Sequence, residues 1–344
     1  MRILFGILNS IVFILVSNNI LIAQIELKNP AIYQFSPDVE KLLVFFDQDT
    51  IGYDDYYRPV NIQIIDLSTG KSQLIWKDQL TYLTDKNAIY WIDNNTIYFP
   101  DNNLVKLKSN LIEKINLPKL AVVLGFSQSL KSFLYINYDI NNNKFNLFER
   151  KNENGENQNI NIGIIERFYE ISDAKPPIEI ENWDTQNKVL FFGYGGNNYS
   201  LFQFDFNNSL LSNIARYKSD KFWDDIKFIV LNNQIFVHNK KNKELILLND
   251  SLCRKWDDVL NSTVLNEKYL LIQKLNGIYK LNTLTFNVDQ IIIDQHFLNK
   301  KLVKAKNSKL YFIEEIGKNY RDPINHNTDY MINIYQVDLN ELGK

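Results

Sequence analysis

Two long polar segments hold most of the residues in this chain that could take part in binding or catalysis. One is residues 47–59, DQDTIGYDDYYRP, and the other is residues 314–329, EEIGKNYRDPINHNTD. Each begins with acids at the end of an apolar run and continues into tyrosine, arginine and proline. Arginine can hold a carboxylate or phosphate through two parallel hydrogen bonds, and tyrosine rings can stack on a sugar or peptide. The two segments therefore predict a ligand-binding site.

The candidate binding residues come from both segments. They are acids, tyrosines and arginines: Asp47, Asp49, Tyr56, Tyr57, Arg58, Glu314, Tyr320 and Arg321. The alternative is that both segments are solvated loops whose acids and arginines pair with each other. The first segment also offers carboxylates to a calcium ion, through Asp47, Asp49, Asp54 and Asp55, although their spacing is not that of an EF-hand. No other cofactor and no other metal site is expected.

No catalytic motif is visible. The three histidines, His238, His296 and His326, lack the spacing of metal ligands, and no G-x-S-x-G elbow is present. The glycine-rich stretch 193–198 lies between two strand-like runs, whereas a phosphate loop needs a helix behind it. We read that stretch as a hairpin. Cys253 is the only cysteine, so no disulfide can form within the chain.

A repeating pattern of strands and turns would hold these residues in place. Residues 31–76 contain four short apolar runs separated by turn residues, and similar units begin near residues 88, 121, 178, 226, 263 and 302. The aromatic content, 13%, also favours strands. One unit cannot bury both of its faces and must stack on copies of itself. We therefore predict an all-β single β-propeller of seven blades, or six if two weak units are one.

The first unit resembles a known family. Residues 35–46, FSPDVEKLLVFF, and then residues 61–71, NIQIIDLSTGK, are similar to the repeat of TolB-like and related WD-repeat-like secreted propellers, SPDGxxLxF followed by IxxxDLxxGK. Val39 stands where that repeat has glycine. Among the later units, only Val337-Asp338-Leu339 in the last one matches well. The resemblance implies the fold but little about function, because such propellers serve many roles.

The two ends of the chain are expected to meet in the last blade. After the strand at 331–339 only five residues remain, which is too few for a fourth strand. Residues 24–29 form a free strand just before the first unit. Pairing between these two segments would close the ring and leave no exposed edge.

The N-terminus predicts export. Arg2 precedes the apolar run 3–16, and Ala23-Gln24 offers a small residue for cleavage, so residues 1–23 are interpreted as a signal peptide and 24–344 as the propeller. The alternative is an uncleaved anchor. Beyond residue 24 no apolar segment approaches the length that spans a bilayer. The mature protein is expected in the periplasm, at the cell surface or secreted, as a monomer.

The charge composition of the chain excludes one class of binding partner. The net charge is −2 and no cluster of Lys and Arg forms a stripe, so nucleic acid is not expected. The sequence favours a non-enzymatic propeller that binds an envelope protein, a peptide or a glycan on one face. The alternative is a propeller-fold glycan hydrolase or lyase that uses axial carboxylates. A third interpretation is a structural role in an envelope complex.

Overall fold

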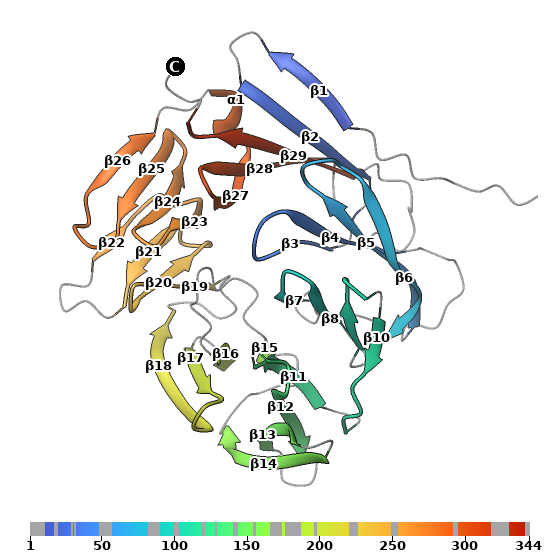
Figure 1. Cartoon of the computed structure of the whole chain (residues 1–344). Helices are drawn as coiled ribbons and strands as arrows, with labels where there is room; N and C mark the ends of the chain where they lie inside the picture. Colours follow the sequence, from blue (N-terminus) through green and yellow to red (C-terminus); the bar gives the residue numbers. More distant parts are fainter. Residues whose placement is uncertain are drawn as a thin grey trace, which may run out of the picture. The chain divides into compact units, whose positions relative to one another are not determined.

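The computed structural model describes most of the chain, in segments separated by gaps. The segments are 11–16, 20–28, 30, 32–47, 57–81, 90–99, 103–109, 111–118, 121–127, 129–139, 144–153, 156–165, 174–175, 187–195, 198–219, 226–248, 254–291, 295–317 and 330–340. Their strands form seven antiparallel sheets, six of four strands and one of five (Figure 1). This is the all-β, seven-bladed β-propeller that the repeats predict, and the six-bladed alternative is wrong.

The chain divides into two compact units, and each contains whole blades. The unit of Met1–Tyr82 with Asn261–Lys344 contains blades one, six and seven, numbered along the chain. Blade one is β3 Ile32–Phe35, β4 Lys41–Asp47, β5 Tyr57–Asp66 and β6 Ser72–Thr81. Blade six is β23 Asn261–Asn266, β24 Tyr269–Lys274, β25 Gly277–Asn282 and β26 Val288–Ile291. Blade seven is β27 Lys301–Lys306, β28 Lys309–Ile316, β29 Met331–Asp338, β2 Ile20–Lys28 and β1 Ile11–Val16, and the short helix α1 Gln295–Leu298 precedes it.

The second unit, Leu83–Leu260, contains blades two to five. Blade two is β7 Tyr90–Asp93, β8 Thr96–Phe99, β9 Asn103–Lys106 and β10 Leu111–Lys114. Blade three is β11 Ala121–Phe126, β12 Ser132–Asp139, β13 Lys144–Glu153 and β14 Glu156–Ile165. Blade four is β15 Ala174–Lys175, β16 Lys188–Gly195, β17 Asn198–Asp205 and β18 Leu210–Lys218. Blade five is β19 Ile226–Leu231, β20 Gln234–Asn239, β21 Glu244–Leu247 and β22 Lys255–Trp256.

The start of blade four corrects one expected boundary. We expected this unit to begin near residue 178, but its first strand is β15, Ala174–Lys175, which pairs with Phe192 and Gly193 of β16. Two residues are too few for a pattern, and the prolines that follow in the sequence hide the strand further. The glycine-rich stretch is the hairpin between β16 and β17, as predicted.

The last blade joins the two ends of the chain, as predicted. Ala23 to Lys28 of β2 pair with Gln336 to Met331 of β29, and the blue β2 runs along the dark red β29 in Figure 1. Strand β1 then pairs with β2 and makes blade seven five-stranded. The pairing that was expected for residues 24–29 thus begins at Ala23, one residue before that segment. Cleavage of the N-terminal segment stays a prediction.

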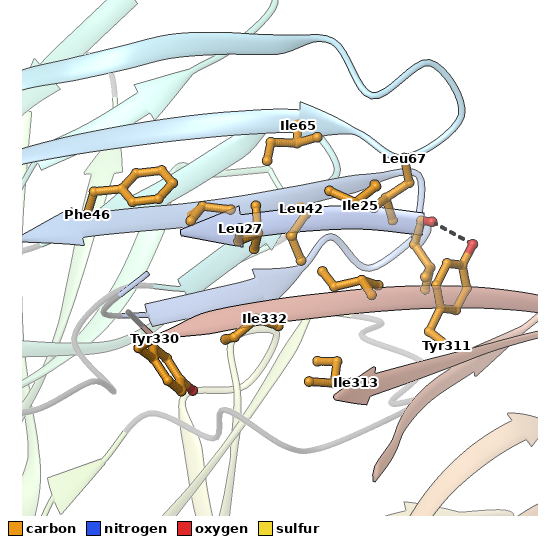
Figure 2. Packing of buried hydrophobic residues seen from close by; sticks show 13 residues of the cluster. Ile25, Leu27, Leu42, Phe46, Ile65, Leu67, Tyr311, Ile313, Tyr330 and Ile332 are labelled. Atoms are coloured by element: carbon orange, nitrogen blue, oxygen red, sulfur yellow. Dashed lines mark hydrogen bonds between the residues drawn. The ribbon is translucent and has the colours of Figure 1, made fainter. Parts of the chain in front are cut away.

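Blade seven buries one face against blade one. Alternate residues of β28 and β29, among them Tyr311, Ile313 and Ile332, pack against Leu42 and Ile65 of blade one (Figure 2). Ile25 and Leu27 from β2 belong to the same cluster. The hydroxyl of Tyr311 donates to the backbone oxygen of Val39 at 3.4 Å, the dashed line in Figure 2.

The opposite face of blade seven packs against blade six. Leu302, Leu310, Phe312, Tyr335 and Val337 gather there with Phe297 of α1 and with Leu271 and Ile278 of blade six. In β28 the side chains therefore alternate between the two neighbours, as a strand covered on both faces requires. This alternation decides which way the polar residues farther along β28 and β29 point.

The motif residues of the first unit build turns. The backbone N–H of Lys41 donates to the Ser36 hydroxyl at 2.9 Å, and Val39 lies at φ 59°, where the family repeat has glycine. Blade three repeats this turn with Ser132, Ser127 and Leu130, whose φ is also 59°. The best-matched residues of the repeat therefore account for the fold rather than for a site.

Candidate functional site

The structure describes half of the predicted binding residues. Asp47 is the last residue of β4, Tyr57 and Arg58 are in β5, and Glu314 is in β28. The other four predicted residues lie outside the described part: Asp49, Tyr56, Tyr320 and Arg321. Asp54 and Asp55 of the calcium hypothesis lie outside it too. The adjacency of the two polar segments thus stays a prediction.

One expected boundary is corrected here. Residues 57–59 are not in a loop but begin β5, where Tyr57 pairs with Thr81 and Arg58 with Leu80 of β6. In the described residues β4 pairs no further than Asp47 with Val60. Among the residues that the structure describes, β5 is bordered at Pro59 by β6 alone, and a proline without an N–H is tolerated in such an edge position.

Glu314 is the predicted residue for which the structure shows the surroundings of the side chain. Its Oε1 is 3.0 Å from Nζ of Lys300, and its Oε2 accepts a hydrogen bond from the Tyr335 hydroxyl at 2.5 Å. The Lys300 ammonium also lies over the Tyr335 ring, 4.4 Å from its centroid. Lys300 is 3% exposed, whereas Glu314 is 38% exposed. The lysine is enclosed, and the carboxylate keeps a face toward solvent.

These contacts set the charge of the cluster. The Tyr335 hydroxyl and the Lys300 ammonium stabilise the carboxylate, so the pKa of Glu314 lies below its ordinary value of 4.5. Burial and the Glu314 charge raise the pKa of Tyr335. At neutral pH, Glu314 is therefore an ionised acceptor and Tyr335 a neutral donor.

A glutamine from blade six positions Lys300. Gln273 is 2% exposed, and its Nε2 donates to the backbone oxygen of Lys300 at 2.5 Å. Its Oε1 accepts from the backbone N–H of Leu302 at 2.8 Å and from Nδ2 of Asn261 at 2.8 Å. One side chain thus fixes the chain on both sides of residue 301. Gln273 therefore fixes the backbone from which the Lys300 side chain reaches Glu314.

A polar row crosses blade seven beside this pair. Glu26 of β2 pairs in register with Asn333 of β29, which pairs in turn with Glu314 of β28. Their strand neighbours Ile25, Ile313 and Ile332 face blade one, so alternation directs all three polar side chains to the other face. Asn333 is 6% exposed, and within the described residues its Oδ1 accepts no hydrogen bond. Its side chain also hydrogen-bonds Glu314 and helps to lower the pKa of that carboxyl.

An aromatic edge borders the cluster. His296 of α1 is exposed, and its ring stands nearly perpendicular to the Tyr335 ring at 6.0 Å between centroids. Sequence reasoning named His296 only as an unlikely metal ligand and overlooked Lys300, Tyr335, Asn333 and Gln273. The sequence could have indicated two of these residues. Asn333 and Tyr335 are polar positions within the apolar strand MINIYQVD, which follows a polar segment.

The described segments show neither a metal centre nor a transmembrane helix. In them, no group of three or more His, Cys, Asp or Glu side chains is placed to hold a metal ion. No described helix is long and apolar enough to cross a membrane. Cys253 lies outside these segments.

Comparison with known proteins supports the fold. No family model matches the chain, and no curated protein matches it in sequence. It is similar to the solved structure of an oligogalacturonate lyase in complex with manganese, at 10% identity and a TM-score of 0.52, over 97% of both chains. An oligogalacturonate lyase from Vibrio parahaemolyticus shows 11% identity and a TM-score of 0.48, over 95% of this chain and 97% of that one. Dipeptidyl peptidase 4 from Porphyromonas gingivalis shows 8% identity and a TM-score of 0.48, over 82% of this chain and 48% of that one.

The likeness to the first of these structures, at a TM-score of 0.52, shows the fold alone, because the identity is only 10%. A propeller hosts many unrelated functions, so the activity of a neighbour does not pass to this chain through its fold. The chain is accordingly a seven-bladed β-propeller, and its function must be argued from its own side chains.

Proposed function

We propose that this chain is an exported, non-enzymatic β-propeller that binds a protein, peptide or glycan partner at the end of blade seven where Glu314 lies. The observation that carries the proposal is the ionised, 38% exposed Glu314 held by a buried lysine and a tyrosine. A carboxylate whose own fold supplies two donors is fixed in position before a ligand arrives. Fixing a binding group in advance lowers the entropy lost on binding.

The charge state of Glu314 favours binding over acid catalysis. A general acid needs a pKa near the working pH, and glycosidases raise the pKa of a carboxyl by burial. The Tyr335 and Lys300 contacts do the reverse to Glu314. A carboxylate with a lowered pKa is also a weak base. It remains a good acceptor for hydroxyl, amide or ammonium donors.

The direct test is binding with and without this carboxylate. The full chain and its Glu314→Gln variant are applied to an array of short peptides and to an array of oligosaccharides. Glutamine keeps the size of the side chain and one acceptor oxygen, so the variant should fold. We expect the signals of the specific binders to fall about tenfold or more, as for loss of a charge-assisted hydrogen bond.

Glu113 provides a matched control. It pairs with Lys106 at 2.7 Å and is 43% exposed, close to the exposure of Glu314, but it lies on the outer strand of blade two. Glu113→Gln should leave every specific signal unchanged. Equal signals for wild type and Glu314→Gln on all probes would overturn the assignment of the site.

Export is a separate part of the proposal and rests on residues 1–23. Expression of the full chain in a bacterium with a periplasm, followed by mass measurement of the N-terminus, tests it directly. A mature chain that begins at or near Gln24 supports export. A chain that retains its N-terminus and stays in the cytoplasm overturns this part.

A further inference from the structure

We infer that β2 takes part in two competing events, cleavage of the N-terminal segment and closure of the ring, and that the cut between Ala23 and Gln24 must come first. The inference rests on the export part of the proposed function, and it adds the limits and the order of processing. It is carried by the number of strands in blade seven and by the pairing of β2 on both of its edges.

Blade seven has one strand more than every other blade. Six sheets have four strands, whereas β1 is the fifth strand of the sheet that also contains β2, β29, β28 and β27. Strand β1 is the outermost strand of this sheet and pairs with residues 20–25 of β2 (Figure 1). A cut after Ala23 would remove β1 and leave blade seven with four strands, the number that the other blades have.

The part of β2 that closes the ring lies beyond this cut. Strand β2 makes six residue pairs with β29, and residues 24–28 make five of them. Ile25 is 6% exposed and Leu27 is 0% exposed, and both belong to the apolar cluster between blades one and seven. A cut after Ile25 would remove one of these buried side chains and the stability that its burial gives. The packing of β2 therefore sets a downstream limit for the cut, one bond beyond the site that the sequence predicts.

In the folded, uncut chain the cleavage site is held between two strands. Ala23 pairs with Phe13 of β1 on one edge and with Gln336 of β29 on the other. A protease that holds an extended substrate through main-chain hydrogen bonds needs a free strand edge. A residue that is paired on both edges offers such an edge only when the sheet opens locally. Closure thus protects the bond, so the cut must be made while blade seven is still open.

The order of the strands along the chain gives time for this cut. The site is near the start of the chain, whereas β29, which pairs with β2, is the last strand. Roughly 300 residues separate β2 from β29, and their synthesis takes about 15–60 s at the usual rates. Throughout this interval β2 has no β29 to pair with, and the bond after Ala23 stays accessible.

The experiment separates the two events in time by cell-free synthesis of the full chain. Purified signal peptidase is added either during synthesis or after the chain has been completed and folded, and mass measurement of the N-terminus gives the fraction cut. We expect the wild type to be cut at Ala23–Gln24 when the protease is present during synthesis. Late addition should cut it about tenfold more slowly or less, because cleavage then depends on the small population in which the sheet is open.

Two leucine variants test whether closure causes this protection. Leu27→Asp places a charge in the buried cluster and should keep blade seven open, so late addition should cut this chain as fast as early addition. Leu111→Asp makes the same change on the outer strand of blade two, where the leucine is 46% exposed, and should leave the protection intact. Protection that survives in Leu27→Asp would overturn closure as its cause and the inference with it.

The remaining outcomes separate this inference from export itself. A wild-type chain that is cut at Ala23–Gln24 equally fast on both schedules would support export and overturn the order of events. A mature chain that begins beyond Ile25 would overturn the role of residues 24–28 in closure. Absence of any cut on either schedule would overturn the export part of the proposed function, and the inference with it.

Discussion

Glu149 in blade three and Glu314 in blade seven are both glutamates that meet a hydroxyl and a lysine, yet the molecule uses them differently. Glu149 is fully buried, accepts from the Ser209 hydroxyl at 2.6 Å and has Lys151 at 3.7 Å. Ser209 belongs to the turn between β17 and β18 of blade four, so this contact ties two blades together. Glu314 makes its contacts next to an exposed face.

The difference lies in which partner is buried. At Glu149 the carboxylate is enclosed and its lysine is 24% exposed, whereas at Glu314 the lysine is enclosed and the carboxylate is exposed. An enclosed acid can only serve the fold, because no ligand reaches it. An exposed acid on an enclosed lysine is held in place and stays available. The two pairs have the same residue types and differ in which member is buried, and this difference decides whether the carboxylate can be reached by a ligand.

The largest expected effect comes from removing the enclosed acid. Glu149→Ala should lower the free energy of unfolding by about 3 kcal/mol, because the Ser209 hydroxyl loses its acceptor and a buried cavity remains. Glu149→Gln should cost about 1 kcal/mol or less, since glutamine still accepts from Ser209. Denaturant unfolding of both variants measures this. If Glu149→Ala lowered the free energy of unfolding as little as Glu149→Gln, Glu149 would not have the structural role that distinguishes it from Glu314.

The buried tyrosine of blade seven gives the next largest effect, at alkaline pH. Burial first, and then the Glu40 charge, raise the pKa of Tyr311 from 10.0 to about 12. The neutral hydroxyl therefore adds stability that is complete below pH 10.0 and declines as pH rises toward about 12. Tyr311→Phe should remove this decline and cost about 1 kcal/mol at neutral pH through the lost hydrogen bond to Val39. Unfolding curves from about pH 8 to about pH 12 test it, and parallel curves for the two proteins would contradict it.

The fold could be predicted from the sequence because its signals are local. Turn residues such as Ser36 and Asp38 form the local hydrogen bonds that their types suggest, with the backbone nitrogen of Glu40 3.1 Å from Oδ1 of Asp38. Alternating apolar runs predicted most strands, and the short C-terminal end predicted the pairing of β2 with β29. Each of these inferences needs only neighbours along the chain or a count of strands.

The site could be predicted only in part because its partners come from different elements. Glu314 stood out as an acid after an apolar run. Its partner Lys300 precedes β27, and Gln273, which holds Lys300, belongs to blade six. No spacing in the sequence relates residues 273, 300 and 314, so only stacking of the blades brings them together. Residues 57–59 were assigned to the polar segment 47–59, but they belong to β5, because their pairing partner is β6 of the same blade and not the strand that precedes the segment.

A smaller effect is expected at acid pH from Glu314. Its pKa is lowered, so its contribution to stability is present above 4.5 and is lost as pH falls through the folded-state value. Because the side chain is 38% exposed, solvent screens the interaction, and the contribution should be about 1 kcal/mol or less. The difference in unfolding free energy between wild type and Glu314→Gln should shrink on going from about pH 7 to about pH 3. A difference that grows over this range would mean that the carboxylate is not stabilised in the fold.

The smallest change in the free energy of unfolding is expected from glycine substitutions at two residues with a positive φ, one buried and one exposed. They are Val39 at 59° and Lys243 at 58°. Glycine at either position relieves a conformation that costs about 1–2 kcal/mol for a residue with a side chain. Val39 is 3% exposed and packs between blades one and seven, so Val39→Gly also loses about 1.5 kcal/mol of apolar burial. Its net effect should be close to zero.

Lys243 is exposed in the turn before β21, so Lys243→Gly has little burial to lose and should stabilise the protein by about 0.5–1 kcal/mol. The midpoints of denaturant unfolding of Val39→Gly and Lys243→Gly, each measured against wild type, test this prediction. If Val39→Gly stabilised as much as Lys243→Gly, the valine side chain would contribute nothing to the packing between the blades. That result would weaken the view that burial decides what a residue does here, because the same backbone strain would then give the same energy in an enclosed and an exposed turn.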